Sequence, residues 1–60
     1  MKTFSTETAA FNAGGDMVAA LCREGKPNFG FRVLNHEGGF KVLMVPDQVK
    51  WMSGVLPFYL

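Results

Sequence analysis

The sequence predicts a small α+β domain in which an N-terminal helix packs on a two-stranded antiparallel hairpin, followed by a short C-terminal helix and an apolar tail. Three observations predict this α–β–β–α order. The first half of the chain has apolar residues at helical spacing, two apolar runs flank a Gly-Gly turn, and a second short helical pattern follows. We expect the sixty residues to form one domain, spanning 1–60.

The first helix is expected within residues 4–27. Ser5 or Thr6 is suited to cap its first turn, because a side-chain oxygen there accepts a hydrogen bond from a free backbone amide. Gly25 offers a left-handed cap at the other end, and Pro27 prevents continuation. Met17 flanks the predicted apolar stripe, whose members are Phe11, Gly14, Val18, Leu21 and Cys22.

Two adjacent glycines, Gly14 and Gly15, interrupt this helical pattern. Each glycine costs about 1 kcal/mol relative to alanine inside a helix. Asp16, directly after them, is a good cap residue and could begin a new helix. The sequence therefore leaves two alternatives open, one continuous helix or two pieces over residues 5–13 and 16–24.

The hairpin is predicted from two segments rich in aromatic and β-branched residues, 28–34 and 40–45, joined by residues 35–39. Gly38 and Gly39 are expected to supply the positive φ angles of a tight turn. The register follows from the requirement that one face be apolar throughout.

In that register Val33 opposes Val42 and Phe31 opposes Met44. One face then collects the largest apolar side chains, and we expect the helix to cover it because so short a chain needs these side chains in its core. The members of this predicted inner face are Phe29, Phe31, Val33, Phe40, Val42 and Met44.

The opposite face of the hairpin mixes charged and apolar residues. Arg32 and Lys41 are diagonal neighbours there, among Leu34, Leu43 and Val45, with Gly30. A face that is half apolar is seldom left wholly in water. Either the C-terminal tail folds over this face, or a partner covers it.

The C-terminal part is predicted to form a short helix over residues 45–54, with Pro46 at its first position and Gly54 at its end. Residues 55–60 are almost wholly apolar, and Pro57 limits them to an edge strand. Aromatic side chains are concentrated in this part of the chain. They either close the core or form a contact surface, and they are Trp51, Phe58 and Tyr59.

Composition and motifs argue against several classes of function. The net charge of +1 gives no strong field toward nucleic acid or acidic membranes, and no apolar run approaches the roughly 20 residues that span a bilayer. Cys22 is the only cysteine and no metal-ligand spacing occurs, so we predict no cofactor and no metal. His36 and Glu37 adjoin in the turn without a nucleophile, and we predict no enzymatic activity. A lone thiol without a signal segment favours the cytoplasm.

Residues 26–33, "KPNFGFRV", partly resemble the RNP1 motif of cold-shock and RRM proteins, in which a basic residue precedes alternating aromatic residues on a strand. In those proteins exposed rings stack on nucleobases. The segment departs from the motif where Pro27 and Asn28 replace a single glycine. The resemblance implies a nucleic-acid surface made of Phe29, Phe31, Arg32 and Lys41, with Lys26.

The favoured hypothesis is a protein–protein interaction module. It would be an accessory regulator or inhibitor, of the kind that phages and other mobile elements make against host enzymes. The nucleic-acid binder is the first alternative, and a homodimer in which residues 55–60 pack on another copy is the second. The predicted partner-binding residues are Arg32, Leu34, Lys41, Leu43, Trp51, Phe58 and Tyr59.

Overall fold

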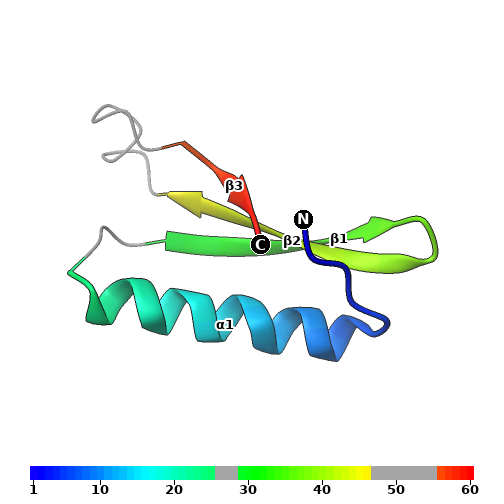
Figure 1. Cartoon of the computed structure of the whole chain (residues 1–60), viewed down its shortest axis with the longest axis horizontal. Coiled ribbons are helices and arrows are strands. Elements are labelled where there is room, and N and C mark those ends of the chain that lie inside the picture. Colours follow the sequence, from blue (N-terminus) through cyan, green and yellow to red (C-terminus); the bar gives the residue numbers. More distant parts are fainter. Residues whose placement is uncertain (26–28, 47–55) are drawn as a thin grey trace.

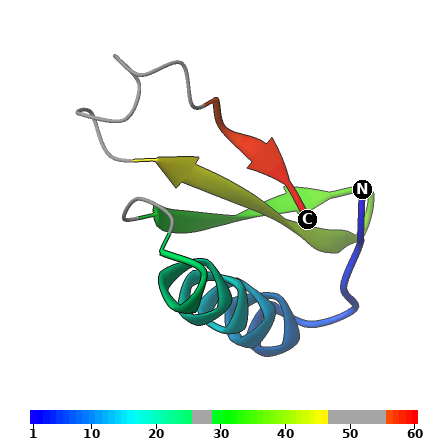
Figure 2. The same cartoon turned by 60° about the vertical axis from the view of Figure 1, so that its left-hand side comes forward.

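The computed structural model describes residues 1–25, 29–46 and 56–60, and there it contains a helix and a three-stranded antiparallel sheet (Figure 1). The sheet has the order β1-β2-β3, and α1 covers one of its faces (Figure 2). The predicted α+β class is thus confirmed. The elements are α1 (Glu7–Arg23), β1 (Phe29–His36), β2 (Gly39–Pro46) and β3 (Phe58–Tyr59).

Both ends of α1 are fixed by the residues that the sequence indicated. The amide of Ala9 donates a hydrogen bond to the Thr6 hydroxyl at 3.1 Å, which makes Thr6 the cap. At the other end Gly25 adopts a φ of 73°, and its amide donates to the Cys22 carbonyl at 3.1 Å. A residue with a side chain adopts that conformation at a cost, so the glycine is well placed.

The helix runs without interruption through its two glycines, which have different environments. Gly14 is buried, and a Cβ atom built there would lie 2.3 Å from a ring carbon of Phe31. A Cβ atom on Gly15 would meet nothing within 4 Å. The absence of a side chain at Gly14 therefore leaves room for the Phe31 ring to pack against the helix.

The buried stripe of α1 differs from the predicted one. Ala10 is fully buried, and Met17, Val18 and Leu21 pack against the core as expected. Phe11, however, is 61% exposed and Cys22 is also exposed. The reason is that the approach at Gly14 sets the inward direction, and both of these residues lie about 60–80° round the helix from it.

The register of the hairpin is the predicted one, with Val33 opposite Val42 and Phe31 opposite Met44. The turn is tighter than expected and consists of Glu37 and Gly38, whose φ angles are 47° and 82°. Two positive φ angles at these positions are typical of a type I′ turn.

Gly39 does not supply a positive φ angle, contrary to the prediction, but lies in β2. A Cβ atom there would be 2.8 Å from the carbonyl oxygen of Phe4. The glycine therefore admits the N-terminal segment beside β2.

The inner face of the sheet forms the core, as predicted. Val42 and Met44 have no exposed surface and contact Ala10 of the helix in one cluster. The larger rings are half-buried and pack around this centre. The partly buried residues of the cluster are Phe4, Met17, Val18, Leu21, Phe29, Phe31, Val33, Phe40 and Leu60.

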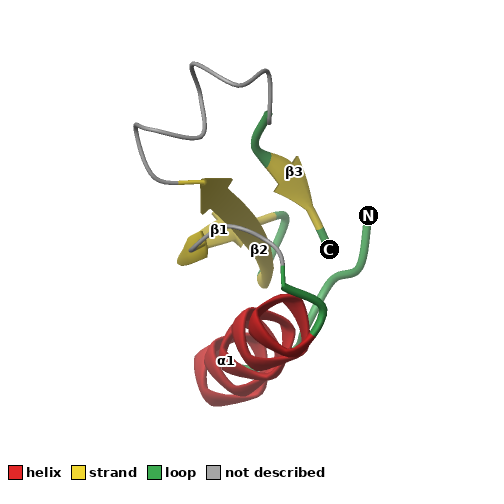
Figure 3. Ribbon diagram, turned by 90° about the vertical axis from the view of Figure 1, so that its left-hand side faces the viewer, coloured by secondary structure: helices red, strands yellow, loops and turns green. Residues whose placement is uncertain are grey.

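Both ends of the chain lie along the edge of β2 that does not face β1 (Figure 3). Phe4 and Phe40 exchange backbone hydrogen bonds of 2.8 and 2.9 Å, and the amide of Leu60 donates to the carbonyl of Val42 at 3.1 Å. The amide of Lys2 donates in turn to the carbonyl of Leu60. The tail is thus an edge strand, as Pro57 indicated, and β2 is the central strand.

The predicted C-terminal helix is not supported. Val45 and Pro46, which were expected to begin it, are the last residues of β2. The remainder of the predicted helix, including Trp51, lies outside the described residues. Proline is tolerated in this strand because its missing N–H falls on the side of β2 away from β1. In the described residues, no helix has both the length and the apolar character needed to cross a membrane.

Candidate interaction surfaces

The face of the sheet opposite α1 combines cationic, aliphatic and aromatic side chains. Strand alternation places on it the residues of β1 and β2 that do not point into the core. Tyr59 joins them because it pairs with Leu43 across β2 and β3. We call this surface the outer face, and its members are Arg32, Leu34, His36, Lys41, Leu43, Val45 and Tyr59.

Cross-strand pairing brings charge and apolar surface together at the centre of the outer face. Arg32 lies opposite Leu43, and Leu34 lies opposite Lys41. The Nζ atom of Lys41 is 4.8 Å from the centroid of the Tyr59 ring, a cation–π contact. Such a contact contributes about 0.5–1 kcal/mol at an exposed site. This contact holds the Lys41 and Tyr59 side chains together, and the Lys41 ammonium group keeps its positive charge on the outer face.

The two layers of the molecule differ in charge. Arg32 and Lys41 lie on the outer face, and no carboxylate of the described part of the chain lies between them. The described carboxylate side chains belong to α1 and its C-terminal end, or to the turn: Glu7, Asp16, Glu24 and Glu37. The sheet layer therefore presents a cationic surface with apolar surroundings, and the helix layer carries most of the negative charge.

His36 and Glu37 form a loose pair where the outer face meets the turn. The His36 Nε2 atom is 3.8 Å from a carboxylate oxygen of Glu37, and the Glu37 side chain is 87% exposed. A pair as exposed as this one contributes little to stability. In residues 1–25, 29–46 and 56–60, no three His, Cys, Asp or Glu side chains gather as metal ligands would.

Five of the seven predicted partner-binding residues lie together on the outer face: Arg32, Leu34, Lys41, Leu43 and Tyr59. Phe58 lies on the other side of the sheet, because it pairs with Met44, and its ring is 5.7 Å from that of Phe29 in a T-shaped arrangement. Trp51 lies outside the described residues. The tail extends the sheet as a third strand, and from it Tyr59 is the residue that reaches the outer face.

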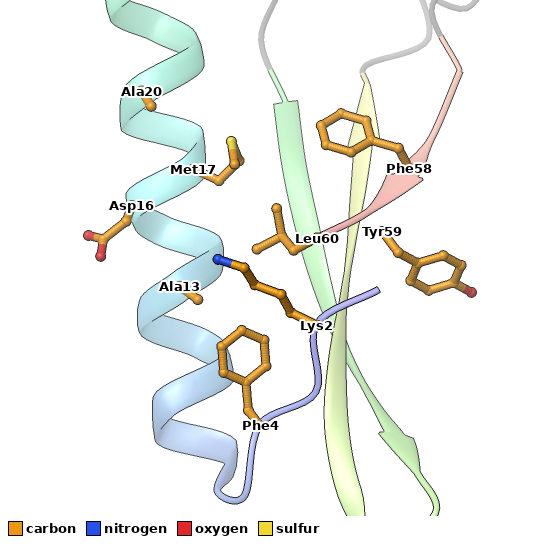
Figure 4. A pocket seen from close by; sticks show the side chains of 9 residues that line it. All are labelled: Lys2, Phe4, Ala13, Asp16, Met17, Ala20, Phe58, Tyr59 and Leu60. Carbon is orange, nitrogen blue, oxygen red and sulfur yellow. The ribbon is translucent and has the colours of Figure 1, made fainter.

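A groove between α1 and the two chain ends was not predicted (Figure 4). It has a volume of about 490 Å³ and is mainly apolar, with the Lys2 side chain directed toward the helix and Asp16 at the border. Tyr59 points away from it, which agrees with its place on the outer face. The lining residues are Lys2, Phe4, Ala13, Asp16, Met17, Ala20, Phe58, Tyr59 and Leu60. No sequence pattern indicates this groove, because it depends on the two ends of the chain meeting beside β2.

The aromatic residues of the RNP1-like segment are part of the inner face. The ring of Phe31 lies against Gly14 and is 5.2 Å from the ring of Phe11. Phe29 packs against the core and against Phe58. A stacking platform of the kind that RNA-binding sheets use requires open ring faces, whereas both of these rings are half-buried on the helix side.

Comparison of the chain with protein-family models, with curated proteins and with solved structures finds no match.

Proposed function

We propose that the protein is a protein-binding module whose outer face docks on an acidic, partly apolar surface of a larger protein, and that binding regulates or inhibits that protein. The observation that carries the proposal is the composition of the outer face. Arg32 and Lys41 stand among Leu34 and Leu43, and the described residues place no carboxylate between them.

Physical complementarity defines the partner's chemistry. Two cations at fixed positions attract a surface with carboxylates and suppress docking on basic surfaces. The aliphatic side chains between them favour a partner with apolar contacts, because apolar surface gains free energy when it leaves water. Tyr59 adds a ring whose position is set by Lys41, and tyrosine is enriched among the residues that dominate binding energies.

Nucleic-acid binding is less well supported. The aromatic residues that would stack on bases pack toward the helix, and the net charge of +1 is small. The cations of the outer face could still meet phosphates, so the experiment below separates the two kinds of partner.

The proposal is tested by affinity purification from the cells in which the protein occurs, comparing the natural chain with two charge reversals. Lys41→Glu changes the outer face, and Arg23→Glu makes the same change of charge on an exposed position of α1. We expect one stoichiometric protein, retained after nuclease treatment, with the natural chain and with Arg23→Glu. Lys41→Glu should lose it while its circular dichroism spectrum stays native.

Two outcomes would contradict the proposal. Equal recovery with both variants would place binding elsewhere on the molecule. Loss of all bound material after nuclease treatment, with affinity falling steeply between low and moderate salt, would indicate a nucleic acid, because bound phosphates release counterions. Regulation is tested by adding the purified chain to the recovered partner and measuring the partner's activity.

A further inference from the structure

Within residues 1–25, 29–46 and 56–60, the backbone groups on the outer edge of β1 have no hydrogen-bonding partner. The sheet order places β1 at an edge, and its one strand partner in the described part of the chain is β2. Phe40 exchanges both of its backbone hydrogen bonds with Phe4, so its groups point away from β1. The direction of the backbone hydrogen bonds alternates from residue to residue along an antiparallel pair. Asn35 lies opposite Phe40 and therefore directs its N–H and C=O toward the open edge, as does every second residue from it along β1. These are Phe29, Phe31, Val33 and Asn35.

An apolar flank of α1 lies above this edge. The ring of Phe11 is 5.2 Å from that of Phe31, which places Phe11 on the β1 side of the helix, and it is 61% exposed. Helical spacing puts three further uncharged residues on the same flank, and Glu7 lies at its N-terminal end. We call the open edge of β1 together with Phe11, Gly15, Val18 and Cys22 the β1 flank.

Nothing in the described part of one copy requires a glycine at position 15. It lies in mid-helix, where glycine is a poor helix former. Its φ is not positive, and the space where its Cβ would stand is empty to 4 Å. Gly14 differs because Phe31 occupies its space. A small residue on an exposed helix surface suits the close approach of another helix.

We propose that two copies of the chain associate through their β1 flanks, with the two β1 strands antiparallel about a two-fold axis at Phe31. In this register Phe31 opposes its own copy and Phe29 opposes Val33, so the open hydrogen-bonding groups of these three residues meet those of the other copy. Arg32 opposes Gly30, and like charges are not brought face to face. Inner-face residues meet inner-face residues, so both helices lie on the same side of a six-stranded sheet.

The dimensions of the fold agree with this arrangement. Because α1 packs on both β1 and β2, its axis lies near the line between them, about one strand spacing from the two-fold axis. Two helices related by that axis are then about 10 Å apart, at the upper end of the usual range for packed helices. Phe11 lies close to the level of Phe31, so its ring reaches the partner copy's helix near that copy's Gly15.

The area is that of a weak dimer. In this register the two β1 strands overlap over residues 29–33, which is about 17 Å, and each helix is about 25 Å long. With each layer about 10 Å deep, the contact covers about 400 Å² per copy. Stable specific interfaces bury at least about 1,000 Å² in total, and smaller ones are weak or transient. We therefore expect a weak dimer that forms at high protein concentration, with the two outer faces joined in one continuous surface.

The first test is the mass of the full chain measured by sedimentation over a range of concentrations. Phe11→Lys removes the ring and places like charges near the two-fold axis. The new lysine also lies four residues after Glu7, and such a Glu–Lys pair stabilises the helix of a single copy, so the variant should stay folded. Asn12→Lys adds the same charge at the next residue, which is exposed on another side of α1. We expect the natural chain and Asn12→Lys to dimerise alike, and Phe11→Lys to raise the dissociation constant at least about tenfold.

The second test is amide hydrogen exchange at low and high concentration, which shows where the copies meet. The amides of Phe31 and Val33 face the open edge and should become protected as the concentration rises. The amides of Arg32 and Leu34 face β2 and should be protected throughout. A monomer at all concentrations, equal dimerisation of both lysine variants, or a dimer in which Phe31 and Val33 still exchange rapidly would each overturn the proposal.

Discussion

The two faces of the hairpin come from the same two strands and behave differently. On the inner face Val42 and Met44 are fully buried under α1. On the outer face their neighbours Lys41 and Leu43 are half-buried, and Tyr59 reaches them from outside the hairpin. Alternate residues of one strand thus lie in the core and on the surface, and neighbouring substitutions should have unlike effects on stability.

The largest contrast is expected between Met44→Ala and Leu43→Ala. Removing most of a fully buried methionine side chain leaves a cavity and lowers the free energy of unfolding by about 2–5 kcal/mol. A domain this small has little more stability than that, so Met44→Ala should be largely unfolded. Leu43→Ala should remain folded, with a loss below about 1.5 kcal/mol, because its side chain keeps part of its contact with water.

Urea denaturation followed by circular dichroism measures both changes. Equal losses at the two positions would mean that the outer face is as deeply buried as the inner one in the intact protein.

The next contrast is between the two adjacent glycines of α1, where the same substitution should change the free energy of unfolding in opposite directions. Gly14→Ala would place a methyl group against the Phe31 ring, and overpacking costs about 1–3 kcal/mol. The gain in helix propensity, about 1 kcal/mol, offsets only part of that cost. Gly15→Ala meets open space and should stabilise the helix by up to about 1 kcal/mol.

Thermal unfolding at a concentration low enough for single copies compares the two glycine variants. Stabilisation by both alanines would show that the ring of Phe31 is not seated on Gly14.

The smallest effect is expected at the turn, which joins the two strands and belongs to neither face. Glu37 adopts a φ of 47°, an uncommon conformation for a residue with a long side chain. Glu37→Asn gives the Asn-Gly pair that type I′ turns favour and should raise stability by about 0.5–1 kcal/mol. The exposed contact with His36 contributes little to offset this gain. A fall in the midpoint of urea denaturation would contradict the assigned turn.

The inner face could be predicted from the sequence because several residues within the same two strands independently indicate the same register. Placing Val33 opposite Val42 is the pairing that gathers every aromatic side chain of both strands on one side, which is then apolar throughout. Thr6 and Gly25 likewise identify the ends of α1 by their own chemistry. These features need no knowledge of distant residues.

The features that were missed depend on contacts between distant parts of the chain. Spacing alone placed Phe11 in the core, but the seating of Phe31 on Gly14 turns the helix so that Phe11 faces outward. The meeting of Phe4 and Leu60 beside β2 created an unpredicted groove. Pro46, which suits the start of a helix, was equally compatible with the end of a strand.

Strand alternation correctly predicted which hairpin residues of the candidate site lie on the outer face, but it could not place the residues of the tail. Arg32, Leu34, Lys41 and Leu43 follow from the register, and all four lie on the outer face. Tyr59 reaches that face and Phe58 does not, because the pairing of β3 with β2 decides which of two neighbours points outward. Nothing local in the tail specifies that pairing.

The difference in accessibility between the two faces is tested most directly by the rate at which a thiol reagent modifies adjacent positions of β2. Leu43→Cys and Val42→Cys would each be made in a chain carrying Cys22→Ser, since Cys22 is exposed. We expect the thiol at position 43 to react at least about tenfold faster than the one at 42, because only the latter requires the core to open. Equally slow reaction at both positions would show that the outer face is covered in the free protein, and its role as a docking surface would then be contradicted.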